Sequence, residues 1–178
     1  MKQFILLFDT KCTQIVTLWP TSVRPFMLAV TALAFPVVLL PIIVAGTVLF
    51  YNRGNHTVSA SFFVVLLSLG VNSLLKLFLH RNRPGTLYVG AMKYKTYSFP
   101  SGHAFGAVVT YGFIAHLLIQ VASLVVGVAI FLLSVLLIIS IGVSRIYLGA
   151  HFPTDVVAGW IFGTVSLVLI INYLHPLV

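Results

Sequence analysis

Five long runs of apolar residues limit what this chain can fold into. They cover about residues 26–50, 57–79, 101–120, 122–143 and 154–173. Each has about the length, near 20 helical residues, that crosses the hydrocarbon core of a bilayer. Because that core offers no water to unpaired N–H and C=O groups, each run is expected to be helical. The sequence therefore predicts an all-α integral membrane protein with about five transmembrane helices, folded as one domain over residues 1–178.

The segment before the first run, residues 3–18, mixes apolar and polar side chains. This pattern is typical of an amphipathic helix that lies in the membrane interface, and Trp19 would anchor its end. Pro36 and Pro41 lie inside the first run. Because neighbouring helices compensate for the hydrogen bonds that a proline removes, we expect both residues to kink a continuous membrane helix.

Charge is scarce in this chain and almost all of it is positive. Hydrophobic residues make up 60% of the sequence and charged residues 7%, and ten lysines and arginines face two acids, Asp9 and Asp155, for a net charge of +8. Most basic residues lie between or beside apolar runs, so we expect lipid head groups or phosphate as partners, and no nucleic acid. No obligate protein partner is indicated. Cys12 has Leu18 instead of an arginine six residues later, which excludes the loop of a cysteine-dependent phosphatase.

The remaining polar and ionisable residues form three clusters, within residues 76–84, 100–103 and 144–155. The first cluster ends the second apolar run, the second begins the third run, and the third joins the fourth and fifth runs. Counting the runs therefore places all three clusters on one side of the membrane. Because ionisable residues are costly beside a bilayer, such a group of them indicates a functional site.

Three basic residues in these clusters, Lys76, Arg83 and Arg145, have the chemistry to surround one phosphate. Arginine offers a planar fork of hydrogen-bond donors, and lysine offers a point charge. The alternative for each is a side chain that extends from a helix end to the interface without binding anything in particular. That alternative, or loose attraction to head groups, is the interpretation that we favour for Arg81, Lys93 and Lys95.

The sequence Pro100-Ser101-Gly102-His103 stands where the third apolar run begins. A helix N-terminus there would offer free backbone N–H groups and the positive end of the helix dipole to a phosphate. Gly102 lets the backbone approach a ligand closely. Ser101 is a good N-cap residue, and that role alone would explain the serine. It does not explain His103 beside it, which we interpret as a candidate catalytic residue.

His151 and Asp155 are four residues apart, a spacing that a helical turn places on one face. A carboxylate at one imidazole nitrogen fixes the tautomer and leaves the other nitrogen as a nucleophile. The alternative is a buried structural pair, which we rank second because Asp155 is one of only two acids. Two acids are also too few for the carboxylate ligands of a magnesium or two-metal site, so we expect no metal and no cofactor.

Together the three clusters resemble the signature of the type 2 phosphatidic acid phosphatase superfamily, the membrane lipid phosphate phosphatases related to vanadium haloperoxidases. The matching blocks are Lys76 with six residues before Arg83-Pro84, then Pro100-Ser101-Gly102-His103, then Ser144-Arg145 with five residues before His151 and three more before Asp155. Three blocks in this order are far more specific than one short motif. The N-terminal segment differs, since members of this family commonly have six spans and an interfacial helix here replaces the first.

The resemblance implies a reaction and a set of roles. His151 would attack phosphorus and form a phosphohistidine, Asp155 would orient it, and His103 would protonate the leaving oxygen. The phosphate would be bound by Lys76, Arg83, Ser101, Gly102 and Arg145. The implied substrate is a bacterial envelope lipid, with undecaprenyl pyrophosphate, lipid A 1-phosphate, phosphatidylglycerol phosphate and phosphatidic acid as candidates. Alternatives are a lipid-to-lipid phosphotransferase and a non-catalytic lipid-binding protein, although a binder needs the cations and not the histidines.

The family resemblance and the distribution of basic residues place this site on different sides of the membrane. Bacterial relatives usually face the periplasm, so the resemblance implies a multi-pass inner (plasma) membrane protein with a periplasmic site. The positive-inside rule favours the cytoplasm, because six basic residues lie on the side of the site and Arg53 on the other. These six are Lys2, Lys11, Arg24, Arg81, Lys93 and Lys95. We expect the periplasmic orientation, because phosphate-binding proteins gather basic residues for chemical reasons.

Overall fold

The computed structural model describes residues 2–92 and 96–174, and these residues form helices and loops without a strand. The helices are α1 (Lys2–Thr17), α2 (Arg24–Ala32), α3 (Pro36–Asn52), α4 (His56–Leu79), α5 (Leu87–Gly90), α6 (Gly102–Val121), α7 (Leu124–Tyr147) and α8 (Pro153–Leu174). A short 3-10 turn, η1 (Thr21–Val23), precedes α2. The predicted all-α fold is confirmed. Lys93 and Lys95, which we expected to attract head groups, lie outside the described residues.

Five helical stretches among the described residues are long and apolar enough to cross a membrane, as predicted. The first joins η1, α2 and α3, and the others are α4, α6, α7 and α8. Their outer surfaces are apolar, with Leu124 and Val125 of α7 among the most exposed side chains. Such a surface suits lipid rather than water, and the protein is a multi-pass membrane protein.

The first span is broken, and this corrects the prediction of one continuous helix kinked at two prolines. α2 ends at Ala32, Phe35 is extended with φ −69° and ψ 147°, and Pro36 begins α3. A residue before proline avoids helical geometry, whereas proline itself suits the first position of a helix. Of these two prolines, Pro41 is the one that lies inside a helix. The break lets α2 pack against α7 while α3 pairs with α4.

The fourth span is longer than predicted, because α7 continues past residue 143 to Tyr147. Ser144 and Arg145 therefore lie in its final turns and not in the following connection. A cation near a helix C-terminus is favoured by the helix dipole. Gly149, with φ +68°, then adopts the left-handed conformation that commonly ends a helix.

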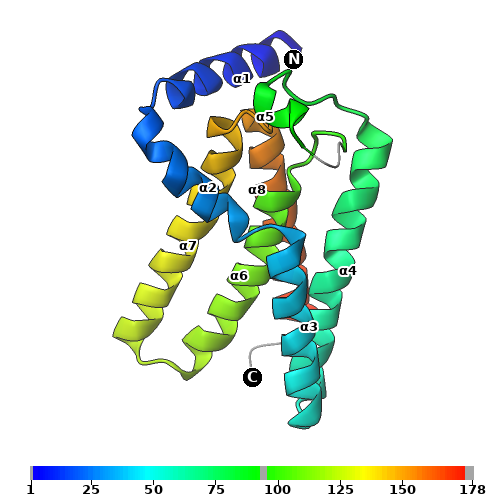
Figure 1. Cartoon of the computed structure of the whole chain (residues 1–178). Helices are drawn as coiled ribbons and strands as arrows, with labels where there is room; N and C mark the ends of the chain where they lie inside the picture. The colour runs from blue at the N-terminus through cyan, green and yellow to red at the C-terminus, as the bar shows by residue number, and fades with distance from the viewer. Residues whose placement is uncertain (1, 93–95, 175–178) are drawn as a thin grey trace.

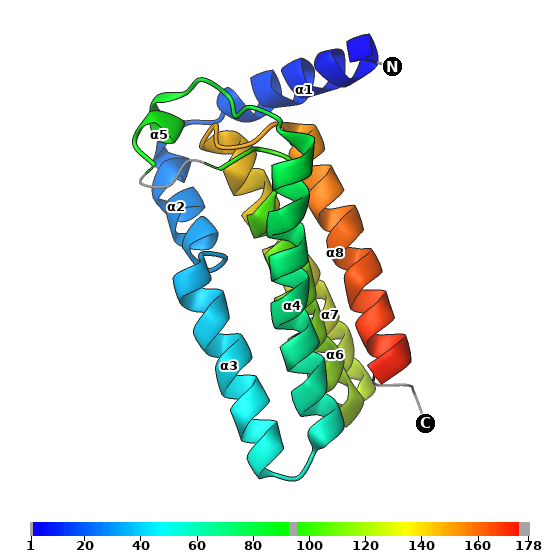
Figure 2. The same cartoon turned by 90° about the vertical axis from the view of Figure 1, so that its right-hand side faces the viewer.

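The elements of the site gather at one end of the helical bundle. Figures 1 and 2 both show α1 crossing that end next to the connection between α7 and α8, with α5 at the same end of the bundle. The α3–α4 and α6–α7 turns lie at the opposite end. Helix α1 exposes apolar side chains such as Phe4 (72%) and Leu6 (63%). This confirms the expected N-terminal amphipathic helix and gives it an apolar surface to place in the interface.

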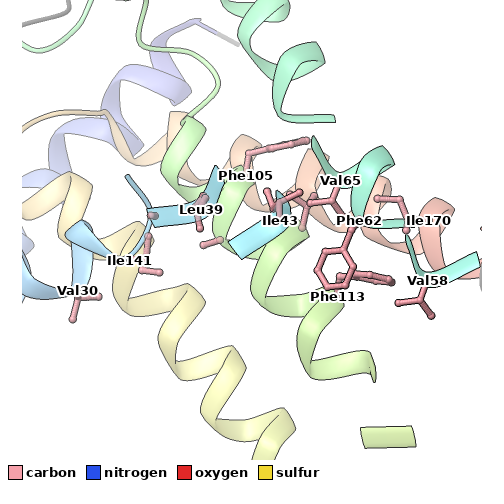
Figure 3. Close-up of a cluster of buried hydrophobic side chains, with 13 residues drawn as sticks. Val30, Leu39, Ile43, Val58, Phe62, Val65, Phe105, Phe113, Ile141 and Ile170 are labelled. Carbon is pink, nitrogen blue, oxygen red and sulfur yellow. The ribbon is translucent and has the colours of Figure 1, made fainter. Parts of the chain in front are cut away.

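A hydrophobic core holds the helices that carry the site. Figure 3 shows Ile43 of α3, Phe62 of α4 and Phe113 of α6 within one buried cluster. The rings of Phe62 and Phe113 meet edge to face, with centroids 5.1 Å apart. A Cβ atom at Gly46 would lie 2.8 Å from the Phe62 ring, so the absence of a side chain there lets α3 and α4 approach closely. This packing fixes α4 relative to α6, and both contribute to the site.

Candidate active site

A cavity of about 850 Å³ opens between α3, α4 and the end of the bundle that α1 crosses. Five of the predicted site residues line it: Lys76, Arg83, Gly102, His103 and His151. The other three, Ser101, Arg145 and Asp155, are fully buried. Hydrogen bonds connect these last three to the cavity wall or to the loops around it. The fold thus brings together residues that are up to 79 positions apart in sequence.

His151 and Asp155 form the buried pair that their spacing predicts, although α8 begins only at Pro153, between them. The Nδ1 atom of His151 lies 3.6 Å from the Oδ2 atom of Asp155. On the other side of the ring, a guanidinium nitrogen of Arg83 lies 3.1 Å from His151 Nε2. Because arginine can only donate, Nε2 accepts and the ring proton is on Nδ1, facing the carboxylate. The Nε2 lone pair is therefore directed at Arg83, and both residues line the cavity.

The electrostatic surroundings keep His151 neutral. The residue is only 2% exposed, and its pKa is lowered to about 3 by this burial and by the nearby cations Arg83, Arg145 and Lys76. The hydrogen bond to Asp155 raises the pKa but does not offset these causes. Burial is the largest cause, because a charged imidazolium loses its hydration there. At neutral pH Nε2 is therefore unprotonated and carries the lone pair that a nucleophile requires.

Ser98 is a site residue that sequence reasoning missed. Its hydroxyl donates a short hydrogen bond to Asp155 Oδ2 and lies 3.4 Å from His151 Nδ1, and the residue is fully buried. The backbone N–H of Phe152 donates to the same carboxylate oxygen at 2.9 Å. The only available signal was the position of Ser98 three residues before Ser101. Together these contacts hold the carboxylate against the histidine.

The three predicted phosphate-binding cations are held by neutral acceptors. Lys76 Nζ donates to the carbonyl oxygens of Tyr97, at 3.4 Å, and of Pro100. Arg83 donates to the carbonyl oxygens of Thr96 and Ala150, at 2.7 and 2.9 Å. These contacts orient the two side chains without neutralising them.

Arg145 is fully buried and is held in the same way. Its Nη1 atom donates to the hydroxyls of Thr31 and Tyr88, at 2.7 and 3.3 Å. Its Nε and Nη2 atoms have no hydrogen-bond partner among the described residues. The contacts with Thr31 and Tyr88 were not predicted, because these residues are 114 and 57 positions away from Arg145 in sequence.

Three cations thus gather at one site without an acidic partner. In the part of the chain that the structure describes, no ion pair involves Lys76, Arg83 or Arg145. Burial, with the nearby Arg145, lowers the pKa of Arg83 below its ordinary value. Buried, uncompensated positive charge is costly, and an anion with several oxygens relieves that cost. The arrangement is therefore suited to bind phosphate.

The start of α6 completes the cavity wall. The Ser101 hydroxyl caps the helix by accepting from the Ala104 N–H at 3.5 Å, the role that its position predicts. A side chain at Gly102 would extend between Asn72 and Lys76, so glycine leaves this space open. The His103 ring packs edge to face on Phe35, with centroids 5.1 Å apart. Its Nε2 atom has no partner among the described residues and is available for a ligand.

Arg81 differs from its predicted role as a side chain that only extends to the interface. Its guanidinium donates to Asp9 at 2.7 Å and to Asp155 at 2.6 Å. Asp9, only 3% exposed, also accepts from the backbone N–H of Thr154 at 2.8 Å. Arg81 thereby joins α1 to the carboxylate behind His151. No local pattern could have indicated this, because Arg81 and Asp9 are 72 residues apart.

Removing this connection should weaken catalysis more than substrate binding. We expect Arg81→Gln to lower kcat about tenfold with little change in KM, because Arg81 positions Asp155 and does not line the cavity. The melting temperature should also fall, since two buried carboxylates lose their charged partner. The measurement is kcat, KM and thermal unfolding of purified protein, with exposed Arg53→Gln as the matched control. Unchanged kcat and melting temperature would contradict a positioning role.

Comparison with known proteins agrees with this geometry. The sequence model of the PAP2 superfamily matches residues 57–177, more than half of the chain. The chain belongs to the PAP2 superfamily. This PAP2 protein is 29% identical to phosphatidylglycerophosphatase B of Bacillus subtilis over 147 residues, which cover 81% of this chain and 71% of that protein. It is 35% identical to an undecaprenyl-diphosphatase of Sulfolobus acidocaldarius over 68 residues, 38% of this chain and 29% of that one.

Two crystal structures share the fold of this PAP2 protein. A transmembrane PAP2-type phosphatidylglycerolphosphate phosphatase from Bacillus subtilis superposes with a TM-score of 0.79 at 24% identity, over 96% of this chain and 92% of that one. LpxE of Aquifex aeolicus superposes with a TM-score of 0.68 at 22% identity, over 92% and 94% of the two chains. At these identities the likeness concerns the fold. The sequence relatives make this chain a phosphatase of the PAP2 type that acts in membrane lipid metabolism.

Proposed function

We propose that this PAP2 protein hydrolyses a phosphate or pyrophosphate monoester of a bacterial envelope lipid through a phosphohistidine intermediate, without a metal ion. One observation carries the proposal: a neutral histidine, His151, has Nε2 at a cavity wall that also presents uncompensated cations. A nucleophile beside an anion site is what phosphoryl transfer to the protein requires.

In the proposed first step, His151 Nε2 attacks phosphorus and the bond from phosphorus to the lipid oxygen breaks. Asp155 stabilises the positive charge that develops on the imidazole ring, and Arg81 and Ser98 hold Asp155 in place. His103, which the bound anionic phosphate beside it keeps protonated, gives its proton to the leaving lipid oxygen. In the second step, water attacks phosphorus, His103 takes the proton of that water, and the P–N bond breaks. Inorganic phosphate leaves and both histidines return to their starting states.

The proposed cations stabilise the transition state by electrostatics. Lys76, Arg83 and Arg145 are already oriented by neutral acceptors, so their donors need little reorganisation as charge moves onto the phosphoryl oxygens. The N-terminal end of α6, formed by Gly102 and the N-cap residue Ser101, would also stabilise the negative charge of the phosphate. Both Asp9 and Asp155 are engaged by Arg81, which supports phosphate neutralisation by these cations rather than by a carboxylate-bound metal.

The shape of the cavity supports a lipid as the substrate. Beyond the cationic end, its wall consists of apolar side chains from α3 and α4, including Leu39, Leu66 and Leu69. Such a wall would receive the part of a lipid next to its head group. Of the four candidate lipids, phosphatidylglycerol phosphate is favoured by the name of the Bacillus subtilis relative. The proposed location is the inner membrane.

The periplasmic orientation of the site is part of the proposal. Arg81 is one of six basic residues that argued for a cytoplasmic site, and its ion pairs give it a reason to be there that is unrelated to topology. A cysteine placed at exposed Asn82, in a Cys12→Ser background, checks the orientation. Reaction with a membrane-impermeant maleimide in intact cells is the expected result, and protection until lysis would reverse the assignment.

Phosphate release from detergent-purified protein tests the function. The four candidate lipids are assayed with EDTA present, and we expect release from at least one with a rate unaffected by the chelator. Rapid acid-free quenching of a reaction with ³²P-labelled lipid should trap an acid-labile label on the protein. Loss of activity in EDTA that added Mg²⁺ restores would contradict the metal-free reaction. Label that passes to a second lipid instead of water would identify a phosphotransferase.

A further inference from the structure

Asn72 is a buried polar residue of the cavity that the proposed reaction does not use. It lies on α4, lines the cavity and is only 3% exposed. Its carboxamide oxygen, Oδ1, accepts no hydrogen bond from any residue that the structure describes. A buried acceptor without a donor is destabilising, and most such atoms in proteins have a partner. The unfilled position therefore suggests a donor on the ligand.

The location of Asn72 indicates which part of the ligand it would contact. It precedes Lys76 by four residues, about 6 Å along the helix axis. Its amide also faces the start of α6, because a Cβ atom at Gly102 would lie 3.5 Å from Asn72 Nδ2. On the other side, Leu69 and Leu66 continue the apolar wall along α4. Asn72 thus stands between the cationic end and the apolar end, where the group directly beyond the ester oxygen would lie.

The chemistry of this position selects among alcohols. An amide oxygen needs an O–H or N–H donor, and ester carbonyls, apolar chains and ionised phosphate oxygens supply none. We propose that Asn72 is a specificity-determining residue that accepts a hydrogen bond from a hydroxyl or N–H group beside the ester bond of the substrate. This inference rests on the proposed function. Its preferred substrates are phosphate monoesters of polyol or amino-sugar head groups, rather than phosphatidic acid or a prenyl pyrophosphate.

A second unpartnered side chain provides a matched comparison. Thr110 of α6 is also buried, and its hydroxyl has no partner among the described residues, but Thr110 does not line the cavity. A change at Thr110 therefore removes a buried polar group without touching the substrate. A change at Asn72 removes both a buried polar group and the proposed substrate contact. Only the second change should alter the preference between substrates.

The test compares phosphatidylglycerol phosphate with an analogue whose terminal glycerol lacks the central hydroxyl. The measured quantity is the ratio of the two kcat/KM values, so a general loss of activity cancels. We expect the wild-type ratio to favour the hydroxyl by about tenfold to thirtyfold, as for one hydrogen bond that leaves a buried acceptor unpaired when it is lost. The ratio should fall to near one in Asn72→Leu and in Asn72→Ala, and stay at the wild-type value in Thr110→Val.

Each result has a distinct meaning. A wild-type ratio near one, or a ratio that Asn72→Leu and Asn72→Ala leave unchanged, would overturn the role of Asn72 while the lipid phosphatase function stands. Faster hydrolysis of undecaprenyl pyrophosphate than of either donor-bearing substrate would overturn it as well. A higher kcat/KM for lipid A 1-phosphate than for phosphatidylglycerol phosphate would assign the donor to a sugar N–H instead of a hydroxyl. Wild-type protein that releases phosphate from none of these lipids would instead remove the proposed function itself.

Discussion

Replacing His151 by glutamine should abolish phosphate release, with kcat reduced by about 10⁴ or more, because the variant lacks the atom that attacks phosphorus. Glutamine is similar in size and keeps a polar atom near Arg83, which donates to His151 Nε2 in the wild-type protein. We therefore expect the fold and the binding of the lipid to survive. The measurement is single-turnover phosphate release, with thermal unfolding as the check on folding.

Asp155→Asn separates the two members of this pair. Asparagine keeps the shape of the side chain that faces His151 Nδ1, but it loses the charge that stabilises the imidazolium. We expect its kcat to lie between the wild-type and His151→Gln values, and the trapped phosphoprotein should still be detectable. Turnover of His151→Gln within tenfold of wild type, or label trapped on that variant, would refute His151 as the nucleophile.

His103→Gln should produce the second large effect, and its size should depend on the leaving group. A positioned acid contributes about 10² to 10⁴ to a rate when the leaving group is a poor one. We therefore expect a loss of that order with a lipid alkyl phosphate. The loss in the rate of the first step should be several-fold at most with an aryl phosphate, because a phenolate leaves without a proton. The measurement is single-turnover release of the alcohol or the phenol from the two substrates, because the later attack of water on the phosphohistidine is the same for both.

The matched control for His103 is His56→Gln, at the exposed first residue of α4 and at the opposite end of the bundle. It should leave both rates unchanged. Equal losses of His103→Gln on the alkyl and aryl substrates would show that His103 holds the cavity wall against Phe35 and does not act as the acid. That result would leave the role of His151 untouched.

The sequence was sufficient for features that depend on local pattern. Run length predicted all five spans, and the spacing of His151 and Asp155 predicted their pairing, because the chain between them is short enough to bring the two side chains together. Features that depend on packing were not predictable. Arg81 and Asp9 meet only after α1 has crossed the bundle, and Arg145 finds Thr31 only because α2 packs on α7.

Two predictions about helix boundaries were wrong, although the local sequence indicated the correct boundaries. Pro36 was expected to kink a helix, whereas a proline preceded by an extended residue more readily begins one. The end of α7 was placed before the polar residues, although Arg145 is well suited to the last turn of a helix. In both cases the backbone preference of the residue decided where the helix begins or ends.

The contact of Asp9 with Arg81 has a practical consequence for the design of experiments. Whatever is attached to α1 is connected, through two charged side chains, to the carboxylate that orients His151. We therefore expect a purification tag ahead of α1 to disturb the carboxylate that orients His151. Figures 1 and 2 show α8 ending at the opposite end of the bundle, so a tag placed after α8 would leave the catalytic end undisturbed.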